Sequence, residues 1–116
     1  MSRPGALLGL MLFAGAMLQA QVKTGLDVLV EEHFAPLWGK RVGVIANQSA
    51  VDREGRNVVN LLKEAPGVTL AAVFTPEHGL TGKVEHGRPV ADGVLPGTDV
   101  PVYSLYGATQ RPTPRV

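Results

Sequence analysis

Apolar residues between positions 24 and 39 recur at spacings close to those of an α-helix, and acidic residues occupy the opposite face. Thr24 and Asp27 resemble a capping box at the start of this helix. Pro36 is predicted to end or kink the helix, and Gly39 to close it. The pattern therefore predicts one amphipathic helix over residues 24–39.

Two short apolar runs, at residues 42–46 and 68–74, flank a second amphipathic pattern. Each run has the length and the valine content of a buried strand. Between them, residues 58–65 follow the i, i+3, i+4, i+7 spacing of a helix, and Pro66-Gly67 forms a stop signal. The predicted order is strand, helix, strand.

This order predicts an α/β fold, a Rossmann-like parallel sheet with flanking helices. Both predicted strands are nearly continuous apolar runs, as is typical of strands that helices cover on both faces. Residues 100–105 supply a third candidate strand, and Pro101 favours its start or a sheet edge. Residues 79–98 are rich in glycine and proline, so we expect a long loop with at most one short element.

Polar side chains follow the first two predicted strands. Asn47 and Gln48 leave the first strand, and Glu77 and His78 follow the second. Because neighbouring parallel strands end at one edge of a sheet, we expect the two loops to meet over one crevice. An amide pair facing a carboxyl and an imidazole suits a polar ligand such as a sugar better than a phosphate.

Glu77 is the candidate acid–base residue, because it stands where an apolar run gives way abruptly to Pro76, Glu77, His78 and Gly79. Apolar walls raise the pKa of a carboxyl, and a raised pKa lets a glutamate donate a proton near neutral pH. Loops at strand ends often carry functional residues. The alternative is that Glu77 and His78 form a solvated turn.

The tripeptide Glu77-His78-Gly79 recurs as Glu85-His86-Gly87. Two imidazoles and two carboxylates are metal-ligating groups, but their spacing matches no helical metal motif. Chance recurrence is the simpler interpretation, so we expect no metal. We also expect no cofactor, because no nucleotide-binding fingerprint is present.

The composition is that of an ordinary globular protein, with 116 residues, 45% of them hydrophobic and 18% charged. The formal net charge is +1, and ten basic and ten acidic residues remain once Arg3 is set aside. A balanced chain without a basic cluster argues against nucleic acid as a partner. The absence of cysteine excludes disulfides and thiol chemistry.

Residues 1–20 are predicted to be a signal peptide, because Arg3 precedes an uncharged apolar stretch from Ala6 to Met17. Cleavage after Ala16 or after Ala20 is compatible with the small residues at both positions. The stretch is short for a membrane span, so we expect no stable span after cleavage. An uncleaved anchor or a buried helix is the rival interpretation. Export to a bacterial periplasm or the outside follows.

Several motifs in order resemble one known family. They are residues 43–49 (GVIANQS), 74–80 (FTPEHGL), 87–90 (GRPV), 101–107 (PVYSLYG) and 112–113 (PT). Together they resemble the N-terminal part of the exo-β-N-acetylmuramidases of the NamZ type. These are exported bacterial glycosidases that release N-acetylmuramic acid from non-reducing ends of peptidoglycan fragments. The resemblance covers residues 22–113.

The resemblance implies a peptidoglycan-derived saccharide as the ligand. It implies Glu77 as the catalytic residue, acting as general acid at the glycosidic oxygen. Asn47, Gln48 and His78 would hold sugar groups or orient Glu77. From the residues alone, Tyr103 and Tyr106 are candidates for stacking on a sugar ring, although paired tyrosines at a strand end are more often packing residues.

Members of this family run for several hundred residues, with a second domain and further acidic residues. Residues 21–116 are therefore expected to be the N-terminal part of a catalytic domain with an unfinished sheet, inactive and marginally folded alone. The alternative is a non-catalytic exported module that binds cell-wall sugars or a partner protein. The oligomeric state stays open.

Overall fold

The computed structural model describes Met1 and residues 21–114. The predicted signal peptide, residues 1–20, therefore lies outside the described residues apart from Met1. Within the described part of the chain, no helix has both the length and the apolar character needed to cross a membrane.

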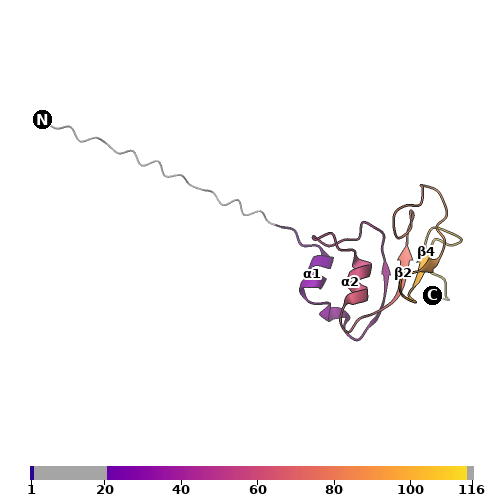
Figure 1. The fold of residues 1–116 in the computed structure, drawn as a ribbon, viewed down its shortest axis with the longest axis horizontal. Coiled ribbons are helices and arrows are strands. Elements are labelled where there is room, and N and C mark those ends of the chain that lie inside the picture. Colours follow the sequence, from indigo (N-terminus) through magenta and orange to yellow (C-terminus); the bar gives the residue numbers. More distant parts are fainter. Residues whose placement is uncertain (2–20, 115–116) are drawn as a thin grey trace.

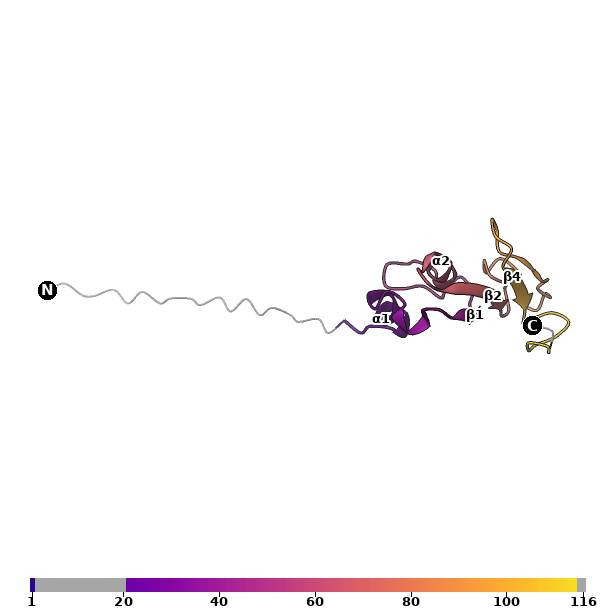
Figure 2. The ribbon, with the colours of Figure 1, turned by 90° about the horizontal axis from the view of Figure 1, so that it is seen from below.

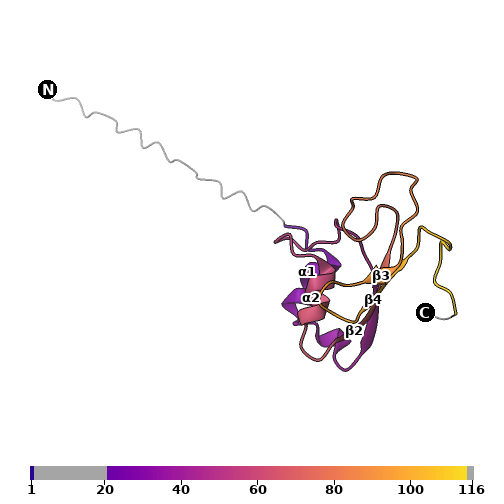
Figure 3. The ribbon, with the colours of Figure 1, turned by 45° about the vertical axis from the view of Figure 1, so that its right-hand side comes forward.

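A four-stranded sheet forms the centre of the fold. Its strands are β1 (Arg41–Ile45), β2 (Thr69–Thr75), β3 (Gly93–Val94) and β4 (Pro101–Ser104), in the order β1-β2-β4-β3. β1, β2 and β4 run parallel and side by side, whereas β3 pairs antiparallel with β4 (Figures 1 and 3). The predicted α/β class is confirmed. The sheet is mixed rather than wholly parallel, because the loop before β4 contributes the short β3.

The first helix is shorter than the sequence pattern predicts. α1 spans Gly25–Glu31 and begins with the predicted capping box at Thr24 and Asp27, but it does not extend to Gly39. Phe34 is left-handed (φ 59°) and only 7% exposed, and a 3-10 turn at Ala35–Leu37 follows. His33, the residue before Phe34, is left-handed as well (φ 51°). Burying a phenylalanine contributes about 1.5–3 kcal/mol, which offsets much of the cost of roughly 1–3 kcal/mol for each strained residue. Core packing thus overrides helical periodicity.

The second helix, α2 (Val58–Glu64), joins β1 to β2 and follows the prediction closely. The Asn57 side chain caps its first turn by accepting a hydrogen bond from the Val59 amide at 3.0 Å. Figure 2 shows α2 lying over β2. Val59 and Leu62 on α2 pack with Val73 of β2 in one hydrophobic cluster.

Both helices contribute to that single cluster and lie to one side of the strands (Figures 1 and 3). On β1, Val42 and Val44 pack against the cluster, whereas Arg41, Gly43 and Ile45 are exposed. Ile45 is 68% exposed. The expectation that helices cover both faces is therefore wrong for β1 within the described residues.

Hydrogen bonds of Asp27 link α1 to the loop before α2. Its carboxylate accepts hydrogen bonds from the Arg53 amide (2.9 Å) and from the Thr24 amide (2.9 Å) and hydroxyl (2.8 Å). The Arg53 amide bond first, and then the Thr24 bonds, lower the pKa of Asp27 from its ordinary 3.8 to about 2. Asp27 is therefore ionised under all but strongly acidic conditions.

The lowered pKa of Asp27 predicts a pH-dependent stability. The ionised form is bound more tightly in the folded state, so its contribution is complete above pH 3.8 and is lost as the pH falls toward about 2. Urea unfolding between about pH 5 and pH 2 measures this loss. Asp27→Asn is expected to flatten the profile in this range. Asp99→Asn, at an exposed aspartate, serves as the control and leaves the profile unchanged; a profile unaltered by Asp27→Asn would contradict the prediction.

Candidate functional site

The loops that follow β1 and β2 meet at the carboxyl edge of the sheet. Ile45 pairs with Phe74 in the parallel register, and the Ala46 amide donates to the Phe74 carbonyl at 3.0 Å. Beyond β2, Gly82 lies directly against the Gln48 side chain, and a Cβ atom at Gly82 would collide with it. The predicted meeting of the two loops is confirmed.

Glu77 lies in the turn after β2, with its carboxylate held from a second part of the same loop. Its Oε1 accepts a hydrogen bond from the Gly87 amide at 2.9 Å. Nδ1 of His86 lies 2.8 Å from the same oxygen. The Glu77 side chain is 29% exposed, whereas that of His86 is 86% exposed. Glu77 is thus a partly covered, fixed carboxylate.

The surroundings of Glu77 lower its pKa below the ordinary value. The Gly87 amide is the main cause; burial acts in the opposite direction, and His86, His78 and the Tyr106 hydroxyl add to the lowering. The expectation that apolar walls raise the pKa of Glu77 is therefore wrong. The hydrogen-bond donor from Gly87 outweighs desolvation, so Glu77 is ionised at neutral pH.

His78 is oriented by the backbone of its own loop. It takes a left-handed conformation (φ 72°), and its Nδ1 lies 2.6 Å from the Val84 carbonyl. Because a carbonyl only accepts hydrogen bonds, Nδ1 carries the proton of this contact, and in the neutral ring the lone pair is therefore on Nε2. The rings of His78 and His86 are 6.2 Å apart. Both imidazoles thus lie close to the Glu77 carboxylate.

Tyr106 follows β4, and its hydroxyl is near enough to Glu77 to contribute to the lowered pKa of that carboxyl. The Leu105 amide donates to the Thr75 carbonyl and the Val90 amide donates to the Tyr106 carbonyl, both at 2.8 Å. These bonds tie the end of β4 to the end of β2 and to the long loop. The structure therefore brings together three of the predicted site residues, namely Glu77, His78 and Tyr106.

The two predicted amides, Asn47 and Gln48, differ in what their side chains contact. Oδ1 of Asn47 accepts hydrogen bonds from the Ser49 amide (3.0 Å) and hydroxyl (2.7 Å), so it closes its own turn. Gln48 is exposed and reaches the loop of Glu77 at Gly82. Neither amide makes a hydrogen bond to Glu77 or His78 within the described residues. Their binding of a sugar remains a prediction.

Sequence reasoning missed His86 and Gly87 as neighbours of Glu77. The recurrence of Glu-His-Gly was the available signal, and the structure shows that it places the second imidazole on the first carboxylate. Thr75 was missed as well. It is 1% exposed, and its hydroxyl has no hydrogen-bond partner among the described residues. An unpaired buried hydroxyl is uncommon in folded proteins, and Thr75 lines a hollow together with His78.

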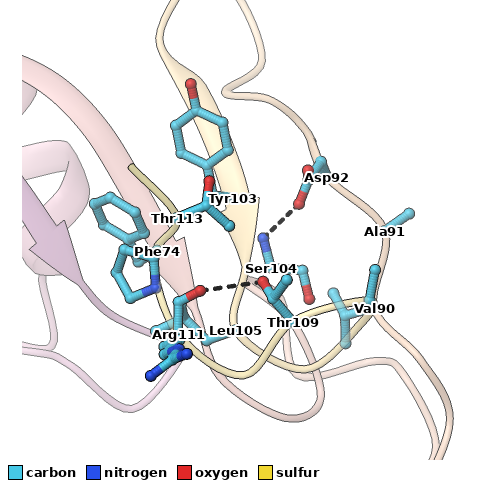
Figure 4. Close-up of a pocket in the computed structure, with 12 residues that line it drawn as sticks. Phe74, Val90, Ala91, Asp92, Tyr103, Ser104, Leu105, Thr109, Arg111 and Thr113 are labelled. Atoms are coloured by element: carbon cyan, nitrogen blue, oxygen red, sulfur yellow. Dashed lines mark hydrogen bonds between the residues drawn. The ribbon is translucent and has the colours of Figure 1, made fainter. Parts of the chain in front are cut away.

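A hollow of about 310 Å³ opens beside β4, next to the site (Figure 4). The rings of Phe74 and Tyr103 lie together on its wall, with centroids 5.6 Å apart. Arg111 adds a cation, and Asp92 accepts a hydrogen bond from the Ser104 amide. Glu77 does not line this hollow. His78 lines a second one, of about 260 Å³, together with Thr75 and Val84.

Comparison with known proteins identifies relatives of the chain. Residues 42–116 match the family described as exo-beta-N-acetylmuramidase NamZ, N-terminal. The peptidoglycan beta-N-acetylmuramidase NamZ of Bacillus subtilis (strain 168) is 42% identical over 96 residues, which cover 83% of this chain and 23% of that protein. The crystal structure of a DUF1343 family protein from Bacteroides fragilis superposes with a TM-score of 0.67 at 46% identity, covering 80% of this chain and 22% of the other.

The chain spans about a quarter of the length of these relatives, as the covered shares of 23% and 22% show. Its match to the family nevertheless extends from β1 through the Glu77 loop to the last described residues. The fold, the sequence and the order of motifs agree. The chain belongs to the NamZ family and corresponds to the N-terminal part of its members.

Proposed function

We propose that this chain is the N-terminal part of a glycoside hydrolase that releases N-acetylmuramic acid from the non-reducing ends of peptidoglycan fragments. Membership of the NamZ family supports the activity. The observation that carries the proposal is the fixed carboxylate of Glu77, with His78 and Tyr106 beside it at the carboxyl edge of the sheet. That edge is where open α/β sheets bind ligands.

Glu77 acts in its ionised form. The resemblance implied a general acid, but a general acid must hold a proton at working pH, and the Gly87 amide opposes this. An ionised carboxylate suits the opposite need, because glycosidic cleavage passes through an oxocarbenium-like transition state with positive charge on the sugar. The leaving oxygen then takes its proton from a different group.

The hollow beside β4 is the proposed place for part of the saccharide. Aromatic rings such as Phe74 and Tyr103 offer apolar faces to a sugar ring. Arg111 matches the carboxylate that distinguishes N-acetylmuramic acid from neutral amino sugars, because guanidinium groups bind carboxylates well. Asn47 and Gln48, on the loop after β1, are further candidates to hold sugar groups, and Gln48 contacts the loop of Glu77 at Gly82. A substrate outside the cell membrane agrees with the signal peptide predicted at residues 1–20.

The direct test is hydrolysis of a chromogenic N-acetylmuramic acid glycoside by the complete protein encoded by the gene. Release of the chromophore from this glycoside, with little release from the N-acetylglucosamine analogue, is the expected result. Equal release from both would contradict the proposed role of a carboxylate-recognising cation. Binding of peptidoglycan fragments without any release would favour the alternative of a non-catalytic cell-wall-binding module.

A further inference from the structure

We propose that Glu77, His78 and His86 form a binding site for one divalent transition-metal ion of the Zn²⁺ type. One carboxylate oxygen and two imidazole nitrogens lie within 4.8 Å of one another. Within the described residues they come from two turns of one loop, which folds back so that both imidazoles approach a single carboxylate. The proposal concerns binding and does not depend on the proposed hydrolase activity.

The ligand set selects the class of ion. Two imidazoles and one carboxylate form a common set for zinc sites that keep a fourth position open. Mg²⁺ and Ca²⁺ prefer sites made of oxygen atoms alone, so they fit less well. Ligand atoms around a tetrahedral zinc ion stand about 3.4 Å apart, given metal–ligand distances near 2.1 Å. The Glu77–His86 contact of 2.8 Å must therefore open slightly, and the widest separation, which is at most 4.8 Å, must close by up to roughly an ångström. The His86 side chain can make this adjustment because it is 86% exposed.

A hydrogen bond to the backbone orients the His78 ring, which distinguishes it from an ordinary surface histidine. Its Nδ1 donates to the Val84 carbonyl at 2.6 Å, which fixes both the tautomer and the ring plane. Metal-binding histidines almost always donate their second nitrogen to a carbonyl or carboxylate in this way. The Nε2 lone pair is then the one directed to an ion. Val84 is outside the cluster, so this contact is independent of the other two ligands.

A backbone hydrogen bond also orients the carboxylate of Glu77. The Gly87 amide holds Oε1 at 2.9 Å, so the carboxylate is oriented before any ion arrives. Nδ1 of His86 lies 2.8 Å from that oxygen, so binding of the ion through this nitrogen would release any proton it carries to the solvent. The sequence alone favoured no metal, because Glu-His-Gly spacing matches no known motif. The folded loop supplies the proximity that spacing could not show, and it leaves the exposed Glu85 outside the cluster.

Calorimetric titration of Zn²⁺ into the full chain tests the proposal, after treatment with a chelator and without a histidine tag. One ion per chain is expected. His86→Ala removes an exposed ligand without touching the core, and His78→Asn keeps a residue that tolerates the left-handed backbone. Each is expected to weaken binding by at least about tenfold. The matched control is His33→Asn, which changes the third histidine of the chain, outside the cluster and likewise left-handed (φ 51°), and leaves affinity unchanged.

Visible absorption of the Co²⁺ form provides a second reading, because the intensity of its bands reports a low-coordinate site with nitrogen ligands. The bands are expected in the parent and in His33→Asn and are lost in His86→Ala. No binding by the parent, equal binding by all variants, or loss caused by His33→Asn would each overturn the proposal. No substrate enters these measurements, so their failure leaves the proposed hydrolase standing, and an inactive enzyme leaves the metal site standing.

Discussion

Replacing Glu77 by glutamine in the complete protein is expected to lower kcat/KM for the release of N-acetylmuramic acid by roughly 10²–10³-fold. Glutamine keeps the size of the side chain and can still accept the hydrogen bond from the Gly87 amide. The substitution therefore removes the negative charge and weakens the contact with His86, while it keeps the shape of the side chain. Steady-state kinetics on a chromogenic glycoside measure the effect. Near-normal release would remove Glu77 from the catalytic machinery.

Glu85→Gln is the matched control for this experiment. Glu85 occupies the equivalent place in the second Glu-His-Gly motif, but it is exposed and lies outside the group formed by Glu77, His78 and His86. We expect it to keep kcat/KM within about twofold, as surface changes usually do. An equal loss in both variants would mean that general charge around the loop, rather than a particular carboxylate, supports the reaction.

The pH profile distinguishes the two roles of Glu77. An ionised carboxylate is active above its pKa, so kcat/KM falls only as the pH drops below the ordinary value of 4.5, because that pKa is lowered. A general acid is active below its pKa, so kcat/KM would fall as the pH rises through it. If kcat/KM of the parent falls at alkaline pH and this fall is absent in Glu77→Gln, Glu77 is a general acid. If kcat/KM of the parent falls at acid pH and this fall is absent in Glu77→Gln, the ionised form of Glu77 is the active one.

Most of the helices and strands could be predicted from local sequence patterns, because these patterns follow from the burial of residues that are close together in the chain. The apolar runs at 42–46 and 68–74 became β1 (Arg41–Ile45) and β2 (Thr69–Thr75), each displaced by one residue, and residues 58–65 became α2 (Val58–Glu64). The end of α1 escaped prediction, since it depends on where Phe34 finds space in the core. No local pattern reveals that the outer face of β1 stays exposed at Ile45.

The candidate site, too, could be predicted from the sequence only in part. The parallel strand order sufficed to predict that the loops of Gln48 and Glu77 meet, because strand ends at one edge are fixed by topology. The contacts of His86 and Gly87 were not predictable, since residues 79–92 follow no period that would give their path. The sign of the pKa shift of Glu77 depended on one of those contacts. The sequence predicted the wrong sign for this shift, so burial alone is a poor guide to the pKa of a carboxyl that a backbone amide can reach.

Replacing Leu62 by alanine is expected to destabilise the fold by about 2–5 kcal/mol. Leu62 on α2 is 4% exposed and packs in the cluster that joins the helix to β2, so its loss leaves a cavity that the sheet cannot collapse to fill. Small domains are stable by only about 5–15 kcal/mol, so this change approaches the whole margin. Urea unfolding measures it as a lower midpoint, and Lys63→Ala, one residue further on the exposed face of α2, is the control and should shift stability by at most about 0.5 kcal/mol. A similar midpoint for both variants would mean that α2 does not hold β2 in place, and the loops of Gln48 and Glu77 would then lack the support that brings them together.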